Sequence, residues 1–179
     1  MRQQQQRQQQ PTRFDAMKPG TKVTVQGLGS APHLNGETGA VLYYEPSKGR
    51  YVVELGDEDE SQQVSLKSDN LQQMVRGVIL QGIDSDASLN GKSGSLLRYD
   101  AQKDRYLVRL VAIPRALSLR PESVLLPNGT CVTIRNLQAK PGLNGQRGTI
   151  TSFDRQAGRY VVQLNQSESA KLKPGNILA

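Results

Sequence analysis

The chain has 179 residues, a formal net charge of +7 and a single cysteine. One cysteine excludes an intrachain disulfide and favours a reducing, intracellular compartment, and no apolar run reaches the ~18 residues of a membrane span. With His33 as the only histidine and Cys131 as the only thiol, nothing completes a catalytic or metal site, so we expect a non-enzymatic protein without a cofactor.

The amino-terminal segment is rich in glutamine and arginine. Residues 1–16 contain no apolar run, so they cannot form a core of their own. We therefore expect a disordered arm in front of the folded part of the chain.

The rest of the chain repeats one pattern three times. Each copy contains Leu-Asn-Gly-x-x-Gly, followed by Gly or Asp and then Arg-Tyr, and the copies begin at Leu34, Leu89 and Leu143. Such faithful repetition of turn residues indicates a repeated fold. We expect three units, residues 17–73, 74–126 and 127–179, joined by short linkers into a semi-rigid row.

Alternating apolar residues predict five short strands in each unit. In the first copy Val23 and Val25 lie two residues apart, and Tyr51 and Val53 share one parity, as one buried face of a strand requires. The closing segment 66–71 predicts one turn of 3₁₀ helix and a short last strand. The fold class is therefore all-β, with three small and strongly bent barrels.

Two glycines recur in each copy and predict different backbone requirements. The first follows asparagine at a tight turn and is expected to need positive φ. The second is expected to permit a close backbone approach or a bulge. These pairs are Gly36 and Gly39, Gly91 and Gly94, and Gly145 and Gly148.

An arginine precedes the core tyrosine of each third strand, and an acidic residue stands five positions before it. The arginines are Arg50, Arg105 and Arg159, and the acids are Glu45, Asp100 and Asp154. One interpretation is a ladder of arginines that contacts an extended acidic partner. We favour a hairpin clamp, in which each arginine bonds turn carbonyls or the acid of its own copy.

Two further features are expected at the surface. Cys131 aligns with Lys22 and Gly77, so its side chain is expected to point outward from the first strand. The acidic run 57–60 could bind a divalent cation or a basic partner, but like charges in sequence are more typical of a solvated loop tip.

The stretch from Val23 to Val41, Val-x-Val-x-Gly followed by Gly-x-x-Gly and a hydrophobic residue, resembles the KOW motif of SH3-like barrels. The Arg-Tyr-x-Val and Leu-Lys-Pro-x-Asn segments also resemble SH3-like or Tudor-like modules. The resemblance covers residues 20–71, 77–124 and 129–178. It implies tandem SH3-like barrels, a fold that binds RNA, peptides or modified histones, or fills space in assemblies.

Charge and aromatic content separate the functional hypotheses. The positive excess lies in residues 76–179, whereas residues 17–75 carry more acidic than basic residues. Most aromatic residues occupy repeated core positions, which disfavours a histone reader and a base-stacking single-strand binder.

We therefore expect a binding or scaffold module with a protein partner, an accessory subunit that docks on a larger assembly through its variable loops and its arm. The alternative is an RNA- or ribosome-associated protein that contacts phosphates through the second and third units. The KOW resemblance places the candidate contacts beside the Gly-x-x-Gly turns, at Lys92, Lys140 and Arg147.

Overall fold

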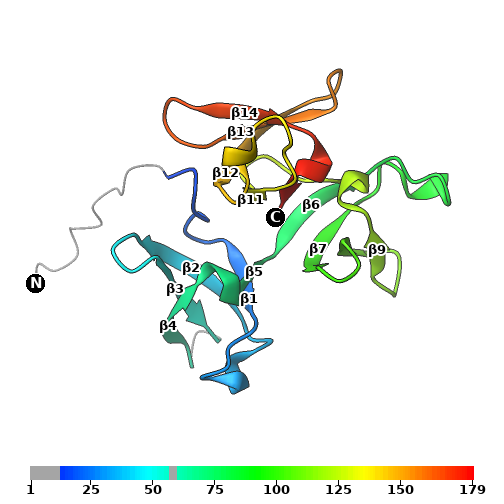
Figure 1. The fold of residues 1–179 in the computed structure, drawn as a ribbon. Coiled ribbons are helices and arrows are strands. Elements are labelled where there is room, and N and C mark those ends of the chain that lie inside the picture. The colour runs from blue at the N-terminus through cyan, green and yellow to red at the C-terminus, as the bar shows by residue number, and fades with distance from the viewer. Residues whose placement is uncertain (1–12, 57–59) are drawn as a thin grey trace, which may run out of the picture.

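The computed structural model describes residues 13–56 and 60–179, which form β-strands and single turns of 3₁₀ helix without any α-helix. The strands make three five-stranded antiparallel sheets (Figure 1). We call them units 1, 2 and 3 in chain order. The all-β class and the strand-rich, barrel-like sheets agree with the prediction from the repeats.

Each unit contains five strands, of which the second is eight residues long in every unit. Unit 1 contains β1 (Lys22–Val25), β2 (Thr38–Glu45), β3 (Arg50–Leu55), β4 (Gln62–Lys67) and β5 (Leu71–Gln73). Unit 2 contains β6 (Val75–Leu80), β7 (Ser93–Asp100), β8 (Arg105–Leu110), β9 (Leu117–Leu119) and β10 (Val124–Leu125). Unit 3 contains β11 (Cys131–Ile134), β12 (Arg147–Asp154), β13 (Arg159–Gln163), β14 (Ser169–Leu172) and β15 (Ile177–Leu178).

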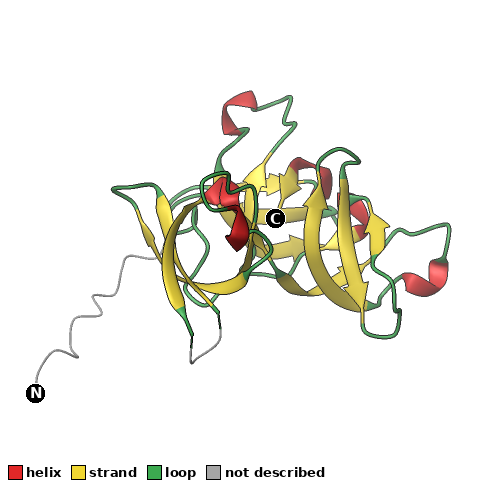
Figure 2. Ribbon diagram, turned by 90° about the horizontal axis from the view of Figure 1, so that it is seen from below, coloured by secondary structure: helices red, strands yellow, loops and turns green. Residues whose placement is uncertain are grey.

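Each sheet closes back toward its own beginning. The order in unit 1 is β4-β3-β2-β1-β5, and units 2 and 3 repeat this order, so the last strand pairs with the first. The register of the long second strand shifts once in each unit, between Val41 and Tyr43 in unit 1 and at the equivalent places in units 2 and 3. A bulge at this place bends the strand and adds twist, and Figure 2 shows the strongly curved sheets that result.

A buried tyrosine lies at the centre of each unit. Tyr51, Tyr106 and Tyr160 are at most 1% exposed, and each packs against the aromatic side chain that ends the second strand. The ring pairs are Tyr44 with Tyr51, Tyr99 with Tyr106, and Phe153 with Tyr160, at centroid distances of 4.8, 5.8 and 4.8 Å. These tilted and edge-on geometries are the ones that aromatic pairs prefer.

The two recurring glycines have the separate roles that their spacing predicts. Gly36, Gly91 and Gly145 have φ of 95°, 82° and 85°, in the left-handed region. The second glycine lies against the third strand. A Cβ on Gly39 would lie 2.2 Å from the carbonyl oxygen of Glu54, and one on Gly94 would lie 2.6 Å from that of Arg109.

The loop before each Leu-Asn-Gly turn is held by the asparagine side chain. In unit 3 Asn144 Oδ1 accepts a hydrogen bond from Leu137 N at 2.8 Å, and Asn144 Nδ2 donates to Leu137 O at 3.0 Å. Asn35 and Asn90 make the same pair of bonds to Leu28 and Ile83. This two-sided bond explains why the spacing of the loop is kept while its residues change.

Asn144→Ala is expected to lower the free energy of unfolding by about 1–2 kcal/mol, because hydrogen bonds to both the backbone N–H and the backbone C=O of Leu137 are lost. Urea denaturation measures this difference. Gln163→Ala, which removes a side-chain bond to Asn165 O on the exposed surface, is the control and should cost much less. Equal midpoints for the two variants would contradict a clamping role for Asn144.

The units do not form an open row. The buried core of unit 2 is continuous with that of unit 3, and the core of unit 1 includes Cys131 from unit 3. Figure 1 shows unit 1 in blue to green, unit 2 in green to yellow-green and unit 3 in yellow to red, gathered around one centre. Because β5 of unit 1 also lies against β7 of unit 2, each unit contacts both of the others, a closed arrangement that the short linkers alone did not predict.

Candidate binding surfaces

The core tyrosine of each unit holds a backbone amide from outside the sheet of that unit. Met17 N donates to Tyr51 Oη at 3.1 Å, and Leu126 N donates to Tyr160 Oη at 2.8 Å. These two donors belong to the segments that lead into units 1 and 3. In unit 2 the donor is Ala179 N, 3.0 Å from Tyr106 Oη.

Burial raises the pKa of all three phenols, that of Tyr160 to about 12, so they remain neutral and can accept these bonds. In units 1 and 3 the amide donor comes from the segment that precedes the unit. In unit 2 the donor comes instead from the end of unit 3.

Two buried glutamines at the end of unit 1 connect the three units. Gln73 Nε2 donates to Cys131 O at 2.9 Å, and Cys131 N donates to Gln73 Oε1 at 3.4 Å. Tyr99 N of unit 2 donates to Gln72 Oε1 at 3.4 Å. Residues 72 and 73 lie within β5 and form the junction of the molecule.

The expectation that Cys131 points outward is wrong. Its side chain is 2% exposed and lies in the core cluster of unit 1, although the residue belongs to β11 of unit 3. Burial raises the pKa of the thiol, so the neutral form is the stable one. The equivalent Lys22 is exposed, because no second unit covers that edge of unit 1.

Arg147 lies between units 1 and 3 instead of on a free surface. Its Nη1 donates to Tyr51 Oη at 3.3 Å and also contacts Ser68 Oγ, while its Nε is buried without a hydrogen-bond partner among the described residues. A side chain with these contacts holds unit 1 against unit 3. It is not available as the phosphate contact that the KOW resemblance implied.

Residues 13–16 are ordered, in contrast to the disorder expected for them as part of the arm 1–16. Ala16 and Met17 are each 4% exposed, and Phe14 O accepts a hydrogen bond from Thr149 Oγ1 of unit 3 at 2.6 Å. Residues 1–12 lie outside the described part of the chain, as do residues 57–59 of the acidic run.

A polar contact joins unit 3 to unit 2. Arg135 Nη1 donates to Asp104 Oδ1 and to Tyr99 Oη, at 2.8 and 2.9 Å, and Arg135 Nε donates to Gly175 O at 3.2 Å. The hydrogen bond from Arg135, followed by the one from Tyr99, lowers the pKa of the Asp104 carboxyl. Asp104 is therefore committed to this interface.

The expected hairpin clamp is wrong, because none of the three arginines bonds its own turn or the acid of its own copy. Arg50 Nη1 donates to Ser65 O at 3.0 Å, on the neighbouring strand, while Glu45 pairs with Lys48. Asp100 and Asp154 instead accept hydrogen bonds from the backbone amides of their own turns. Arg105 and Arg159 make no side-chain hydrogen bond or ion pair with any described residue.

Lys92 and Lys140 are exposed beside the Leu-Asn-Gly turns of units 2 and 3. Each is a single lysine on a loop of its own unit. With Arg147 engaged between units 1 and 3, the three residues do not make one continuous basic surface.

The largest group of arginines that share one face of a sheet lies on unit 2, where sequence reasoning did not place it. We call it the arginine face: Arg76, Arg98, Arg105, Arg109 and Arg120. The register puts Arg76, Ser95 and Arg109 in one row, and Arg98, Leu107 and Ser118 in the next. Asp100 pairs with Arg105 in a third row, and Arg120 directly follows β9.

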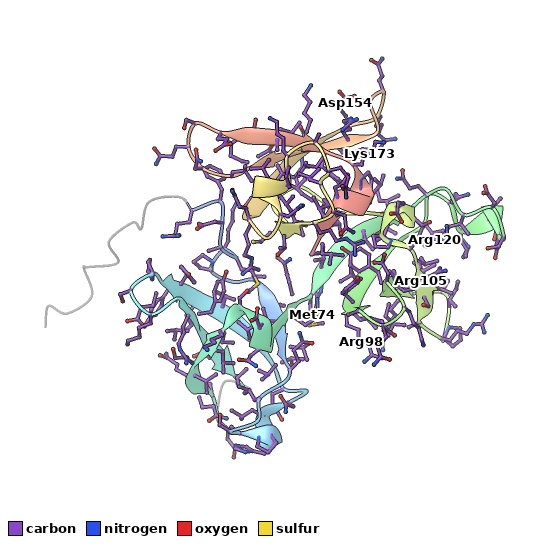
Figure 3. The ribbon with its side chains drawn as sticks, in the orientation of Figure 1. Met74, Arg98, Arg105, Arg120, Asp154 and Lys173 are labelled. Atoms are coloured by element: carbon purple, nitrogen blue, oxygen red, sulfur yellow. The ribbon has the colours of Figure 1, made fainter. Side chains whose placement is uncertain are left out.

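The arginine face points away from the core of unit 2. Its residues alternate with buried ones along the strands, and all are exposed except Arg105, which is half-buried. None of the five guanidinium groups makes an ion pair or hydrogen bond to a described residue, and Asp100 is already bonded to its turn. Figure 3 labels three of them, Arg98, Arg105 and Arg120, along unit 2.

Units 1 and 3 share only part of this charge. Arg98 corresponds to Tyr43 in unit 1 and to Ser152 in unit 3, and Arg109 corresponds to Glu54 and Gln163. The positions of Arg105 and Arg120 are basic in all three units, so unit 2 differs from the other two in Arg76, Arg98 and Arg109.

Comparison with models of protein families and with curated proteins found no match for this chain. Among the residues that the structure describes, no helix is long and apolar enough to cross a membrane.

Proposed function

We propose that this chain is a non-enzymatic binding module, built from tandem SH3-like units that resemble KOW modules, and that it docks as one body on a larger assembly. The observation that carries this proposal is the junction of the three units. Gln72 contacts unit 2 and Gln73 contacts unit 3, and Ala179 at the end of unit 3 bonds to the core of unit 2. Because these polar groups are buried or half-buried, separating the units would leave bonds unmade.

A body of this kind presents loops from three units in one fixed orientation. Repetition of a small fold with variable loops is typical of proteins that use a composite surface for binding. A partner that spans two units therefore gains from preorganisation, since no ordering of the units is needed when it binds.

The alternative is an RNA- or ribosome-associated protein that contacts phosphates. One specific observation favours it, namely the uncompensated charge of the arginine face on unit 2. The two functions are compatible if the assembly contains nucleic acid.

Affinity purification of the native chain, with and without nuclease, tests the proposal. We expect a defined set of proteins to co-purify in both conditions with the native chain and with Cys131→Ala. Cys131→Lys, which places a charge in the contact between units 1 and 3, should lose those proteins that span these units. If every protein that co-purifies with the native chain also co-purifies with Cys131→Lys, docking as one body would be contradicted.

A further inference from the structure

We propose that the arginine face of unit 2 binds the phosphate backbone of duplex nucleic acid without reading its sequence. This inference rests on the proposed binding function and names the ligand of one surface. Five guanidinium groups on one sheet face repel one another, and no described carboxylate pairs with them. Such an arrangement lowers the stability of the free protein slightly, and a polyanion removes that cost when it binds.

The residue type points to phosphates. Arginine presents a rigid fork of donors that matches phosphate and carboxylate oxygens, and the basic side chains in these rows are all arginines. Their rows follow the spacing of a sheet, with neighbouring strands about 4.8 Å apart and alternate residues of a strand about 7 Å apart. A ligand with repeated negative charges can therefore engage several guanidinium groups together.

The three rows of the arginine face contain no exposed apolar side chain, and Ile79, 38% exposed, lies beyond them on β6. This composition disfavours an acidic protein. The centre of a protein–protein interface is usually desolvated and rich in aromatic residues. Here Leu107 is the apolar residue in the middle row, and it is half-buried. Interfaces with nucleic acid are more polar and more positively charged, which fits this composition.

The lack of an exposed ring disfavours a single strand. Proteins that bind single strands stack bases on aromatic side chains. Tyr99, the nearest aromatic residue along β7, pairs with Tyr106 and bonds to Asp104. With no ring on which unstacked bases could stack, the arginines are expected to contact the phosphate backbone of a duplex.

The repeats supply matched variants for a test. Arg98→Ser with Arg109→Gln installs the residues of unit 3 at the equivalent positions of unit 2, so the fold should be kept. Lys92→Gln with Lys140→Gln removes the same charge from the loops beside the Leu-Asn-Gly turns. Thermal melting should show no loss of stability for the arginine pair, because like charges are being separated.

The experiment is a titration of the full chain with mixed-sequence duplex RNA and duplex DNA at several salt concentrations. We expect the arginine pair to lower the affinity at low salt about tenfold and to reduce the salt slope on DNA by about 1.8, close to 0.9 for each contact. The lysine pair should change the affinity less than about threefold, since isolated charges are screened. The RNA and DNA arms show which duplex is preferred.

The inference would be overturned if the chain bound neither duplex at low salt, or if the lysine pair lost as much affinity as the arginine pair or more. It would also be overturned if a single strand of equal length bound more tightly than the duplex. The same holds if polyglutamate bound as tightly as the duplex and its binding depended on the same arginines. Any of these leaves the proposed docking function intact if proteins still co-purify after nuclease treatment. Loss of co-purification alone would contradict docking without affecting duplex binding.

Discussion

Gly39→Ala is expected to lower the free energy of unfolding by about 3 kcal/mol or more. A Cβ at this position would lie 2.2 Å from Glu54 O and 2.7 Å from Leu55 Cδ2, so the backbone of β2 must separate from β3. A main-chain carbonyl within a strand pair cannot move away without breaking its ladder, and the cost exceeds that of ordinary overpacking. Urea denaturation with a constant slope measures the difference.

Gly36→Ala is the matched control, three residues away in the turn before β2. Its Cβ would meet nothing within 4 Å, and only the positive φ of 95° penalises it, by about 1–2 kcal/mol. If Gly39→Ala were no more destabilising than Gly36→Ala, the close approach of β2 to β3 would be incorrect.

Cys131→Lys is expected to detach unit 1 from unit 3 while unit 3 stays folded. Lysine occupies the equivalent position 22 in unit 1 without harm, so the strand itself tolerates it. At position 131 the ammonium would be buried in the core cluster of unit 1, close to the Arg147 guanidinium. A buried charge beside a like charge costs several kcal/mol, which exceeds the strength of a small contact between units.

Nuclear magnetic resonance spectra of the two variants at this position check this expectation. Cys131→Lys should shift the amide signals of Gln73 and of the buried Met17 segment, with native signals kept in β12 and β13. Cys131→Ala, which leaves only a small void, should retain the native contact. Native shifts at Gln73 in the lysine variant would show that Cys131 does not lie in this contact.

The strands and turns were predictable because their causes are local. Alternation with a period of two places Val23 and Val25 in a core, and an asparagine–glycine pair needs one backbone conformation wherever it stands. Three copies of each signal strengthened the prediction. The 3₁₀ turn at Pro32–Leu34 was missed, although the constant spacing between Leu28 and Asn35 was a signal that some bond holds the two together.

The contacts between units were not predictable from the repeats. Because Cys131 is equivalent to Lys22, its side chain was predicted to point outward, and within unit 3 alone that direction is correct. What lies outside that edge is unit 1, and no pattern within one copy encodes its neighbour. The same reason explains why Arg147 was taken for a surface contact, since its bonds go to Tyr51 and Ser68 of a distant part of the chain.

The arginine face escaped prediction for a different reason. Plain alternation from the buried Leu96 would direct Arg98 into the core, next to Tyr106. The register shift between Leu96 and Arg98 turns Arg98 outward, into the row of Leu107. Placing this bulge needs the pairing of β7 with β8, which depends on contacts between strands and not on the sequence of one strand.

The central claim is that the three units form one body, and nitrogen-15 relaxation of the full chain tests it most directly. We predict a single rotational correlation time shared by backbone amides of β2, β7 and β12, because each unit is joined to both others through buried or half-buried contacts. Three different and shorter correlation times, one for each unit, would contradict it.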